Sequence, residues 1–410
     1  MRSTVGSLQP RGAASTGEAS TSEPVMIELD ADAVLAQWCH AASTGHEDRP
    51  GHGGRLDLDD LASLDRVISY RLPLRHRFRR IEVRHGLLIH GPYGWGEVSP
   101  FLDYAPHEWR PWVNAALTCA CHPAPPRRRD SVAVNATVPV VSPERAHAIV
   151  TESGGCTSVK VKVADPRSTL RDDCDRIEAV RDALGSAGQI RVDANAAWTV
   201  DEALDAIDAL DRAAATGGGD GLEYVEQPCA SVEELAEVRR HCSVAIAADE
   251  SVRRAEDPLA VARAGAADLL VLKSQPLGGW QRIHDIVAQT GLPLVMSSAL
   301  ESSLGLARAV ECAASIEHLD FACGLATAQM FTDDVCHPLR PRAGAMHLDD
   351  LAASLTPDEE RIDQSLMTAP QSWSREAHLL VEGIAHALAE HATTGAGADT
   401  RQTIEEGNTQ

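Results

Sequence analysis

Six charged residues stand out between residues 158 and 274 because each one interrupts a run of apolar residues. They are, in chain order, Lys160, Lys162, Asp193, Glu226, Asp249 and Lys273. The first two lie two positions apart in the segment SVKVKV, so in a strand both side chains point to the same side. Each of the others lies near the C-terminal end of a later apolar run. Charges of both signs placed so regularly predict a shared polar centre, because a buried charge is costly without a partner.

The lysines are informative because this chain otherwise uses arginine for positive charge. Of 37 lysines and arginines, only Lys160, Lys162 and Lys273 are lysines. A lysine can give up its proton near neutral pH in a suitable environment, whereas an arginine stays charged. The alternative is that an arginine-rich composition left three lysines by chance, but their positions favour amine chemistry.

Three acids at successive strand ends predict a metal site. Carboxylates that converge on one point repel each other and need a cation, and oxygen ligands favour Mg²⁺, for which Mn²⁺ can substitute. Lysines on opposite sides of such a metal suit the removal of a proton beside a carboxylate, with the metal stabilising the enediolate. Taken singly, each acid could be a solvated loop residue, or an N-cap in the case of Asp249. The whole set favours the metal centre.

Polar residues near these positions are candidates for substrate binding. They are Asn195, Ser297, Ser298, Ser302, Ser303 and Arg79. The asparagine lies two residues after Asp193, and the serines belong to SSALESS, where a strand is expected to pass into a helix that could bind a carboxylate at its N-terminus. The arginine belongs to RHRFRR, a loop that could cover an anionic substrate. Ordinary helix capping and a solvated charge cluster are the alternatives.

The elements that must position these residues alternate between strands and helices from residue 132 onward. We expect strands at 132–138, 158–163, 190–195, 222–227, 244–250, 269–274 and 293–298, with a weaker eighth near Asp320. Helices between them are indicated by one-sided apolar spacing and by capping boxes at Thr199/Glu202 and Ser231/Glu234. This α/β pattern predicts a parallel barrel whose strand C-termini surround one mouth. A doubly wound open sheet is the alternative, but no G-x-G-x-x-G turn follows the first strand.

The rest of the chain is expected to cover the barrel. Strand-like runs between residues 66 and 98 predict a small antiparallel sheet, and a helical stretch with Trp109 and Trp112 follows it. We divide the chain into a disordered or additional segment at 1–55, a capping domain at 56–130 with a contribution from 325–395, the barrel at 131–324 and a flexible tail at 396–410.

Composition narrows the class of protein. The 410 residues carry a net charge of −23, which argues against nucleic-acid binding through a basic surface. No apolar stretch is long enough for a membrane span, and the polar first 25 residues predict no secretion signal. Ten scattered cysteines without a CxxC pair are typical of reduced thiols in a cytoplasmic protein. We expect a small anionic substrate, and the oligomeric state stays open.

Taken together, the motifs KVK (160–162), RVDAN (191–195), EQP (226–228), ADES (248–251) and VLK (271–273) resemble those of the enolase superfamily. The resemblance covers residues 66–345 and points to the muconate-cycloisomerase-like subgroup. Within it, GWGEVSPF (94–101), SSALESSLGL (297–306) and FACGLATAQMF (321–331) are similar to the o-succinylbenzoate synthases of high-GC bacteria. Residues 1–55 have no counterpart in that family, and Ser274 departs from its pattern.

This resemblance implies an enolase-type (β/α)₇β barrel with an α+β capping domain. It implies that Asp193, Glu226 and Asp249 bind Mg²⁺. It also implies that Lys162 is the base, assisted by Lys160, and that Lys273 stabilises the enediolate from the opposite face. The implied reaction is the syn dehydration of 2-succinyl-6-hydroxy-2,4-cyclohexadiene-1-carboxylate to 2-succinylbenzoate in menaquinone biosynthesis.

Two other functions stay open on this scaffold. In an N-succinylamino acid racemase, Lys162 and Lys273 would act as two bases on opposite faces of one carbon. A catalytically inactive barrel that serves as a binding module is the second alternative. Retention of all six charged residues argues against the inactive barrel.

Overall fold

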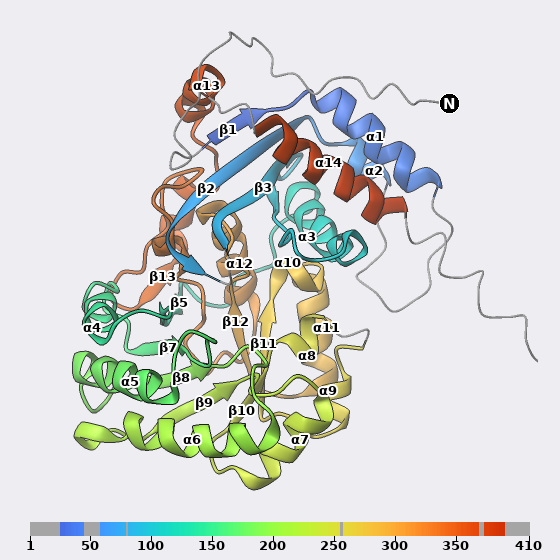
Figure 1. Cartoon of the computed structure of the whole chain (residues 1–410). Coiled ribbons are helices and arrows are strands. Elements are labelled where there is room, and N and C mark those ends of the chain that lie inside the picture. The colour runs from blue at the N-terminus through green and yellow to red at the C-terminus, as the bar shows by residue number, and fades with distance from the viewer. Residues whose placement is uncertain (1–24, 45–57, 79–80, 255–256, 369–372, 390–410) are drawn as a thin grey trace, which may run out of the picture.

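The motif-bearing half of the chain forms a ring of parallel strands, seen in the lower part of Figure 1. The computed structural model describes residues 25–44, 58–78, 81–254, 257–368 and 373–389. Seven strands pair in the order β12-β11-β10-β9-β8-β7-β6. They are β6 (Ala136–Val138), β7 (Ser158–Lys162), β8 (Gln189–Asp193), β9 (Leu222–Glu226), β10 (Ile246–Ala248), β11 (Leu269–Lys273) and β12 (Leu294–Ser297).

The ring closes through a short segment at residues 321–324, near the expected weak eighth strand. The Ser298 N–H donates to the Gly324 carbonyl at 2.9 Å, and the Cys323 N–H donates to the Ala133 carbonyl at 2.7 Å. Parallel bridges therefore join this segment to both edges of the sheet. The predicted barrel is confirmed, and the open doubly wound sheet is wrong.

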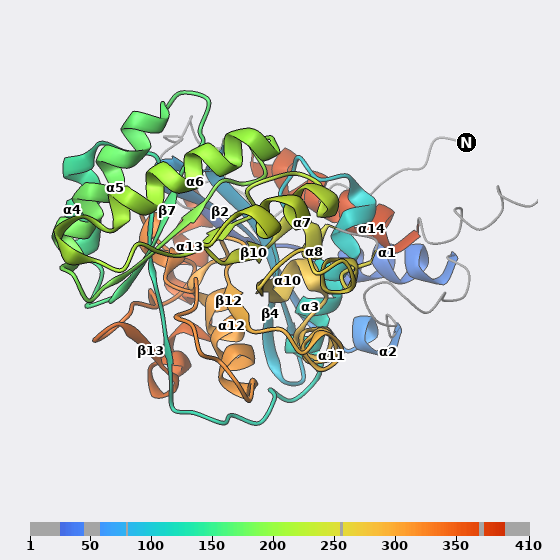
Figure 2. The ribbon, with the colours of Figure 1, turned by 90° about the horizontal axis from the view of Figure 1, so that it is seen from below.

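Helices cover the outside of the barrel, as the view from below shows (Figure 2). The longer ones are α4 (Pro143–Thr151), α5 (Leu170–Leu184), α6 (Val200–Ala214), α7 (Val232–His241), α11 (Trp280–Thr290) and α12 (Ser303–Ser315). Shorter ones are α8 (Glu250–Arg253), α9 (Ala260–Arg263) and α10 (Ser274–Leu277). The capping boxes predicted at Thr199 and Ser231 begin α6 and α7 as expected. Within the described residues, no helix is long and apolar enough to cross a membrane.

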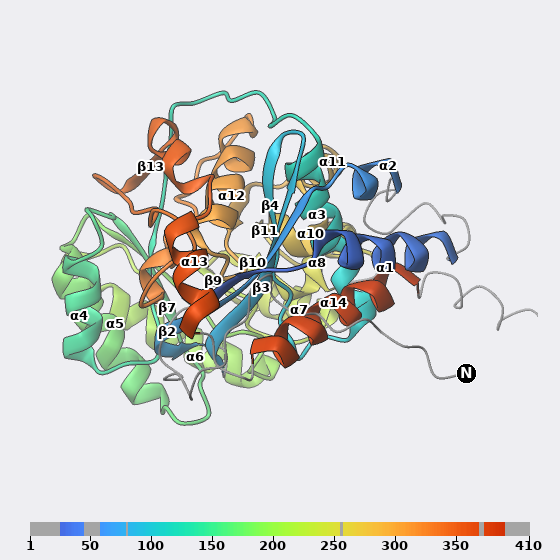
Figure 3. The ribbon, with the colours of Figure 1, turned by 90° about the horizontal axis from the view of Figure 1, so that it is seen from above.

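A second layer lies over the barrel and is built from both ends of the described chain (Figure 3). Its antiparallel sheet has the order β1-β2-β3-β4, with bounds Val25–Glu28, Arg66–Phe78, Ile81–Gly91 and Gly94–Val98. Its helices are α1 (Ala31–Thr44), α2 (Leu58–Ala62), α3 (Arg110–Cys121), α13 (Glu359–Thr368) and α14 (Trp373–Ala389). α1 and α14 pack together, and the buried Trp38 indole donates to the Val381 carbonyl at 3.1 Å.

Two features differ from expectation. The strand expected at 132–138 is split, because β5 (Ser131–Ala133) leaves the barrel and pairs with β13 (Ala345–His347). The segment 1–55, expected to be disordered or additional, supplies β1 and α1 to the covering layer, because the apolar residues of β1 complete its sheet. Residues 1–24, 45–55 and the predicted tail at 396–410 lie outside the described residues. The domain boundaries themselves stay a prediction.

Candidate active site

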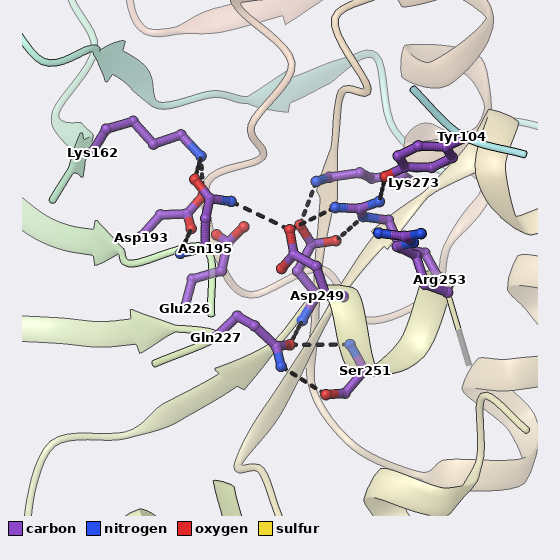
Figure 4. Close-up of polar contacts among 12 residues, drawn as sticks. Tyr104, Lys162, Asp193, Asn195, Glu226, Gln227, Asp249, Ser251, Arg253 and Lys273 are labelled. Carbon is purple, nitrogen blue, oxygen red and sulfur yellow. Dashed lines mark hydrogen bonds and ion pairs between the residues drawn. The ribbon is translucent and has the colours of Figure 1, made fainter. Parts of the chain in front are cut away.

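The lysines and acids singled out in the sequence meet at the mouth of the barrel (Figure 4). Lys160 Nζ lies 2.8 Å from Glu226 Oε2 and 3.7 Å from Asp193 Oδ2. Lys162 Nζ donates to the Asp193 carboxylate. On the other side, Lys273 Nζ lies 2.5 Å from Asp249 Oδ2. These contacts form two clusters, which are linked because Asn195 Nδ2 donates to Glu250 Oε1 at 3.3 Å and Arg253 contacts both Glu250 and Asp249.

Strand register explains this meeting. Along β7, β8 and β9, Lys162 pairs with Asp193 and Asp193 pairs with Glu226, so the three occupy one rung of the sheet. Neighbouring residues on a rung of a parallel sheet project to the same face, here the interior of the barrel. Asp249 follows β10 directly, and Lys273 is the last residue of β11.

Burial makes the electrostatics of the site strong. The three carboxylate residues are 0% exposed. Burial, followed by repulsion from the Asp193 carboxylate, holds the pKa of Glu226 above its usual range. Burial acts the same way on Asp193, but the ammonium groups of Lys162 and Lys160 outweigh it and lower the pKa of that carboxyl. In Lys160, burial opposes the charged form, but attraction to Glu226 and Asp193 raises its pKa.

The chemistry of this donor set fits a hard divalent cation. Asp193, Glu226 and Asp249 are buried oxygen donors, and Asp193 and Asp249 both raise the pKa of Glu226 by repulsion, which a cation between the carboxylates would relieve. In the part of the chain that the structure describes, however, no group of three or more His, Cys, Asp or Glu side chains is arranged as a ready-made metal site. The reason is local, since lysine ammonium groups contact all three carboxylates. The three acids that we expected to converge are thus each paired with a lysine side chain. A metal would replace some of these contacts.

Sequence reasoning missed an arginine that holds one of the acids. Arg253 is 8% exposed, and its Nε donates to Asp249 Oδ1 at 2.8 Å. The same guanidinium bonds the Tyr104 hydroxyl, which belongs to the covering layer, and donates to Glu250 Oε1 at 2.6 Å. The signal was present in the sequence, because Arg253 lies one helical turn after Asp249.

Gln227 is a second missed residue, although it belongs to the EQP motif. It has φ 41°, a left-handed conformation that is costly for a residue with a side chain. Its amide crosses to the next strand end: Oε1 accepts from the Asp249 N–H at 2.9 Å and the Ser251 N–H at 3.1 Å. Its Nε2 donates to the Ser251 Oγ at 2.7 Å and the Cys229 carbonyl at 2.9 Å. One side chain thereby fixes the backbone that carries Asp249.

We expect the substitution Gln227→Ala to lower the free energy of unfolding by about 2 kcal/mol or more, because it leaves buried N–H groups without acceptors. Gln281→Ala, at an exposed position of α11, is the matched control and should stay within about 0.5 kcal/mol of the parent. Urea denaturation of both variants measures the difference. Equal stabilities would contradict the positioning role.

The candidate substrate-binding residues fall into two groups. Asn195, Ser297 and Ser298 line the pocket that contains the lysines, and Asn195 Oδ1 accepts from Lys162 Nζ at 2.9 Å. Ser302 and Ser303 do not line it, because their hydroxyls donate to the buried carboxylates of Glu97 and Asp334. These contacts give the two hydroxyls a structural role, and substrate binding by Ser302 and Ser303 stays a prediction that the pocket lining does not support.

The pocket has walls that the sequence did not indicate, and one predicted residue cannot be placed. Phe78, at the end of β2, lines the pocket, and its ring lies 5.3 Å from Lys162 Nζ. Phe101, Thr137 and Thr327 complete the polar and aromatic lining. Arg79 lies outside the described residues. All ten cysteines are described and free of disulfides, as expected.

Comparison with known proteins agrees with this fold. A family model described as enolase C-terminal domain-like matches residues 143–360, and one described as enolase N-terminal domain-like matches residues 69–120. A structure of a dipeptide epimerase from Enterococcus faecalis V583, complexed with Mg and the dipeptide L-Leu-L-Tyr, is similar with a TM-score of 0.58. It shares 22% sequence identity and covers 71% of this chain and 98% of that chain, so the likeness concerns the fold.

Two curated relatives are much closer in sequence. An o-succinylbenzoate synthase from Thermobifida fusca is 53% identical over 279 residues, which cover 68% of this chain and 86% of the relative. An o-succinylbenzoate synthase from Mycolicibacterium smegmatis is 48% identical over 314 residues, which cover 77% of this chain and 92% of the relative. The chain belongs to the o-succinylbenzoate synthase family of the enolase superfamily.

Proposed function

We propose that this protein is a carbon–oxygen lyase that dehydrates 2-succinyl-6-hydroxy-2,4-cyclohexadiene-1-carboxylate to 2-succinylbenzoate, a step of menaquinone biosynthesis. The observation that carries the proposal is that Lys162 and Lys273 line one pocket and that each contacts a buried carboxylate, Asp193 and Asp249 respectively. Relatives that are 46–53% identical over most of their length support the choice of reaction. A cytoplasmic location stays a prediction, in keeping with free cysteines.

In the proposed reaction, Lys162 Nζ removes the proton from the ring carbon that carries the carboxylate. The hydroxyl on the neighbouring carbon then leaves with its bonding pair and takes up a proton, so that water departs and the ring becomes aromatic. In a syn elimination both events occur on one face, so the newly formed Lys162 ammonium is placed to supply that proton. Asn195 would orient the amine, since its Oδ1 already accepts a hydrogen bond from it.

Lys273 has a different role in this proposal. It reaches the pocket from β11, on the side of Asp249, while Lys162 reaches it from β7, on the side of Asp193. Its ammonium would stabilise negative charge that develops on the substrate carboxylate after the proton is lost. Lys160, buried against Glu226, would keep that acid ionised.

We further propose that Asp193, Glu226 and Asp249 hold Mg²⁺, with Mn²⁺ as a substitute. Bound there, the ion would supply positive charge beside the substrate carboxylate. Support comes from the buried oxygen donors and from the Mg-bound epimerase of the same fold. Arg253 and Gln227 would keep Asp249 in place for this task.

The experiment is an assay of the purified full chain with the cyclohexadiene substrate, following aromatisation by absorbance. We expect EDTA to lower the rate at least about 100-fold and added Mg²⁺ to restore it, since charge stabilisation of this kind contributes several kcal/mol. Mg²⁺ should also raise Tm, because a ligand that binds only the folded state stabilises it. Full activity after exhaustive EDTA treatment would contradict the metal site. Absence of turnover with saturating Mg²⁺ would reject the proposed reaction.

A further inference from the structure

A second cavity lies beside the active-site pocket and has an unusual charge. It has a volume of about 250 Å³ and is lined by Arg75, His76, Arg145, Arg340 and one acid, Glu152, among others. Arg145 lies 3.5 Å from Glu152, and both side chains are partly exposed, so this pair is loose. In a chain with a net charge of −23, three arginines around one hollow mark a place suited to an anion. We call it the arginine cavity.

The arginine cavity adjoins the active site through three shared segments. Thr137 of β6 lines both hollows. Strand β2 supplies Phe78 to the active-site pocket and Arg75 to the arginine cavity. The turn η3 (Thr327–Met330) begins with Thr327 in the active-site pocket and continues with Gln329 and Met330 in the cavity. A molecule anchored at the lysines therefore lies beside the arginine cavity.

The arginine cavity offers more room than the active-site pocket. On the same measure, the space open to the centres of water-sized molecules is about 30 Å³ in the active-site pocket and about 250 Å³ in the arginine cavity. The wider hollow is the better place for a flexible chain attached to a ring. The walls of the arginine cavity also suit such a chain, because Ala136, Pro139, Ile149 and Met330 contribute to its lining together with the arginines. An alkyl chain ending in a carboxylate matches this combination.

Resting on the function proposed above, we propose that the arginine cavity receives the succinyl end of the substrate and that Arg145 and Arg340 bind its distal carboxylate. Guanidinium groups bind carboxylates through paired, charge-assisted hydrogen bonds. The two arginines come from α4 and from the segment after Leu339, outside the strands that carry the lysines and acids. They determine specificity by binding the part of the substrate that does not react.

The test is the double variant Arg145→Gln/Arg340→Gln, assayed with the cyclohexadiene substrate. We expect KM to rise about tenfold or more with kcat within about threefold, because the interaction is the same in the ground and transition states. The affinity for 2-succinylbenzoate, measured by calorimetry, should fall by a similar factor. The affinity for benzoate, which lacks the chain, should not change. Arg340→Lys in place of Gln should recover part of the loss.

Arg171→Gln is the matched control, since this exposed arginine of α5 pairs with Asp175 and lines neither hollow. It should match the parent in every measurement. If the parent turns over the substrate but the double variant keeps its KM and product affinity within about twofold, the assignment of the cavity is overturned while the proposed function stands. If the parent shows no turnover, the proposed function fails, and an unchanged 2-succinylbenzoate affinity in the variant would overturn the cavity separately.

Discussion

Replacing Lys162 by Arg should lower kcat by at least about 10³-fold, because a general base contributes up to about 10⁴-fold and arginine cannot give up its proton. The substitution keeps the positive charge that contacts Asp193 and lies near the Phe78 ring. The fold and the carboxylates should therefore survive, and the loss should be confined to the chemical step.

Three measurements separate this outcome from misfolding. Thermal denaturation should give a Tm near that of the parent, calorimetry should still detect Mg²⁺ binding, and single-turnover kinetics should show no burst of product. Arg171→Lys, at an exposed position of α5, is a control for exchanging arginine and lysine away from the active site, and this variant should be fully active. A Lys162→Arg variant that turns over at nearly the parent rate would contradict the assignment of the base.

Substitution of Lys273 should separate the two functions that share this scaffold. Lys273→Ala removes a buried ammonium beside Asp249 and should lower dehydration about 10²–10³-fold, the cost typical of losing one charge-stabilising group. Lys273→Arg restores the charge, so a dehydratase should regain part of that rate. A racemase needs a proton to pass through Lys273 itself, so Arg should abolish racemisation.

The readout is the exchange of the α-proton of an N-succinylamino acid in D₂O, followed by NMR alongside the dehydration assay. Parent protein that exchanges the proton of both enantiomers, while Lys273→Arg exchanges only the proton that faces Lys162, would assign a second activity to this site. Dehydration that is no faster in the Arg variant than in the Ala variant would contradict a purely electrostatic role for Lys273.

The barrel could be predicted because its signals are local. Each strand is a short apolar run followed by a helix with its own caps, as in α6 and α7. The split of the segment 132–138 could not be predicted, because the partner of β5 is β13, more than 200 residues later. The pairing of β1 with β2 could not be predicted for the same reason, since strand pairing depends on distant residues as well as on the strand itself.

The residues of the site also divide into those that local sequence signals identify and those that depend on distant partners. Charged residues in apolar strands, such as Lys162 and Asp193, can be identified from the sequence because charged residues are rarely buried unless they are paired. Gln227 and Arg253 act through side chains that cross between strand ends, and no spacing rule identifies such a crossing. The position of Ser302 in SSALESS does not reveal that its hydroxyl donates to Glu97, because Glu97 lies on a strand of the other layer.

The contact between Glu97 and the start of α12 has a consequence for any attempt to separate the barrel from the covering layer. The buried carboxylate accepts from the backbone N–H groups of Ser302 at 3.3 Å and Gly305 at 3.1 Å, and a side chain at Gly305 would collide with it. A strand of the covering layer thus caps a barrel helix whose preceding loop, through Ser298, forms the pocket wall. We therefore expect that the barrel cannot form a complete active site without its own covering layer. If the barrel were fused to the covering domain of another protein, it would keep its lysines and acids, but the pocket wall that precedes α12 would lose its support from Glu97.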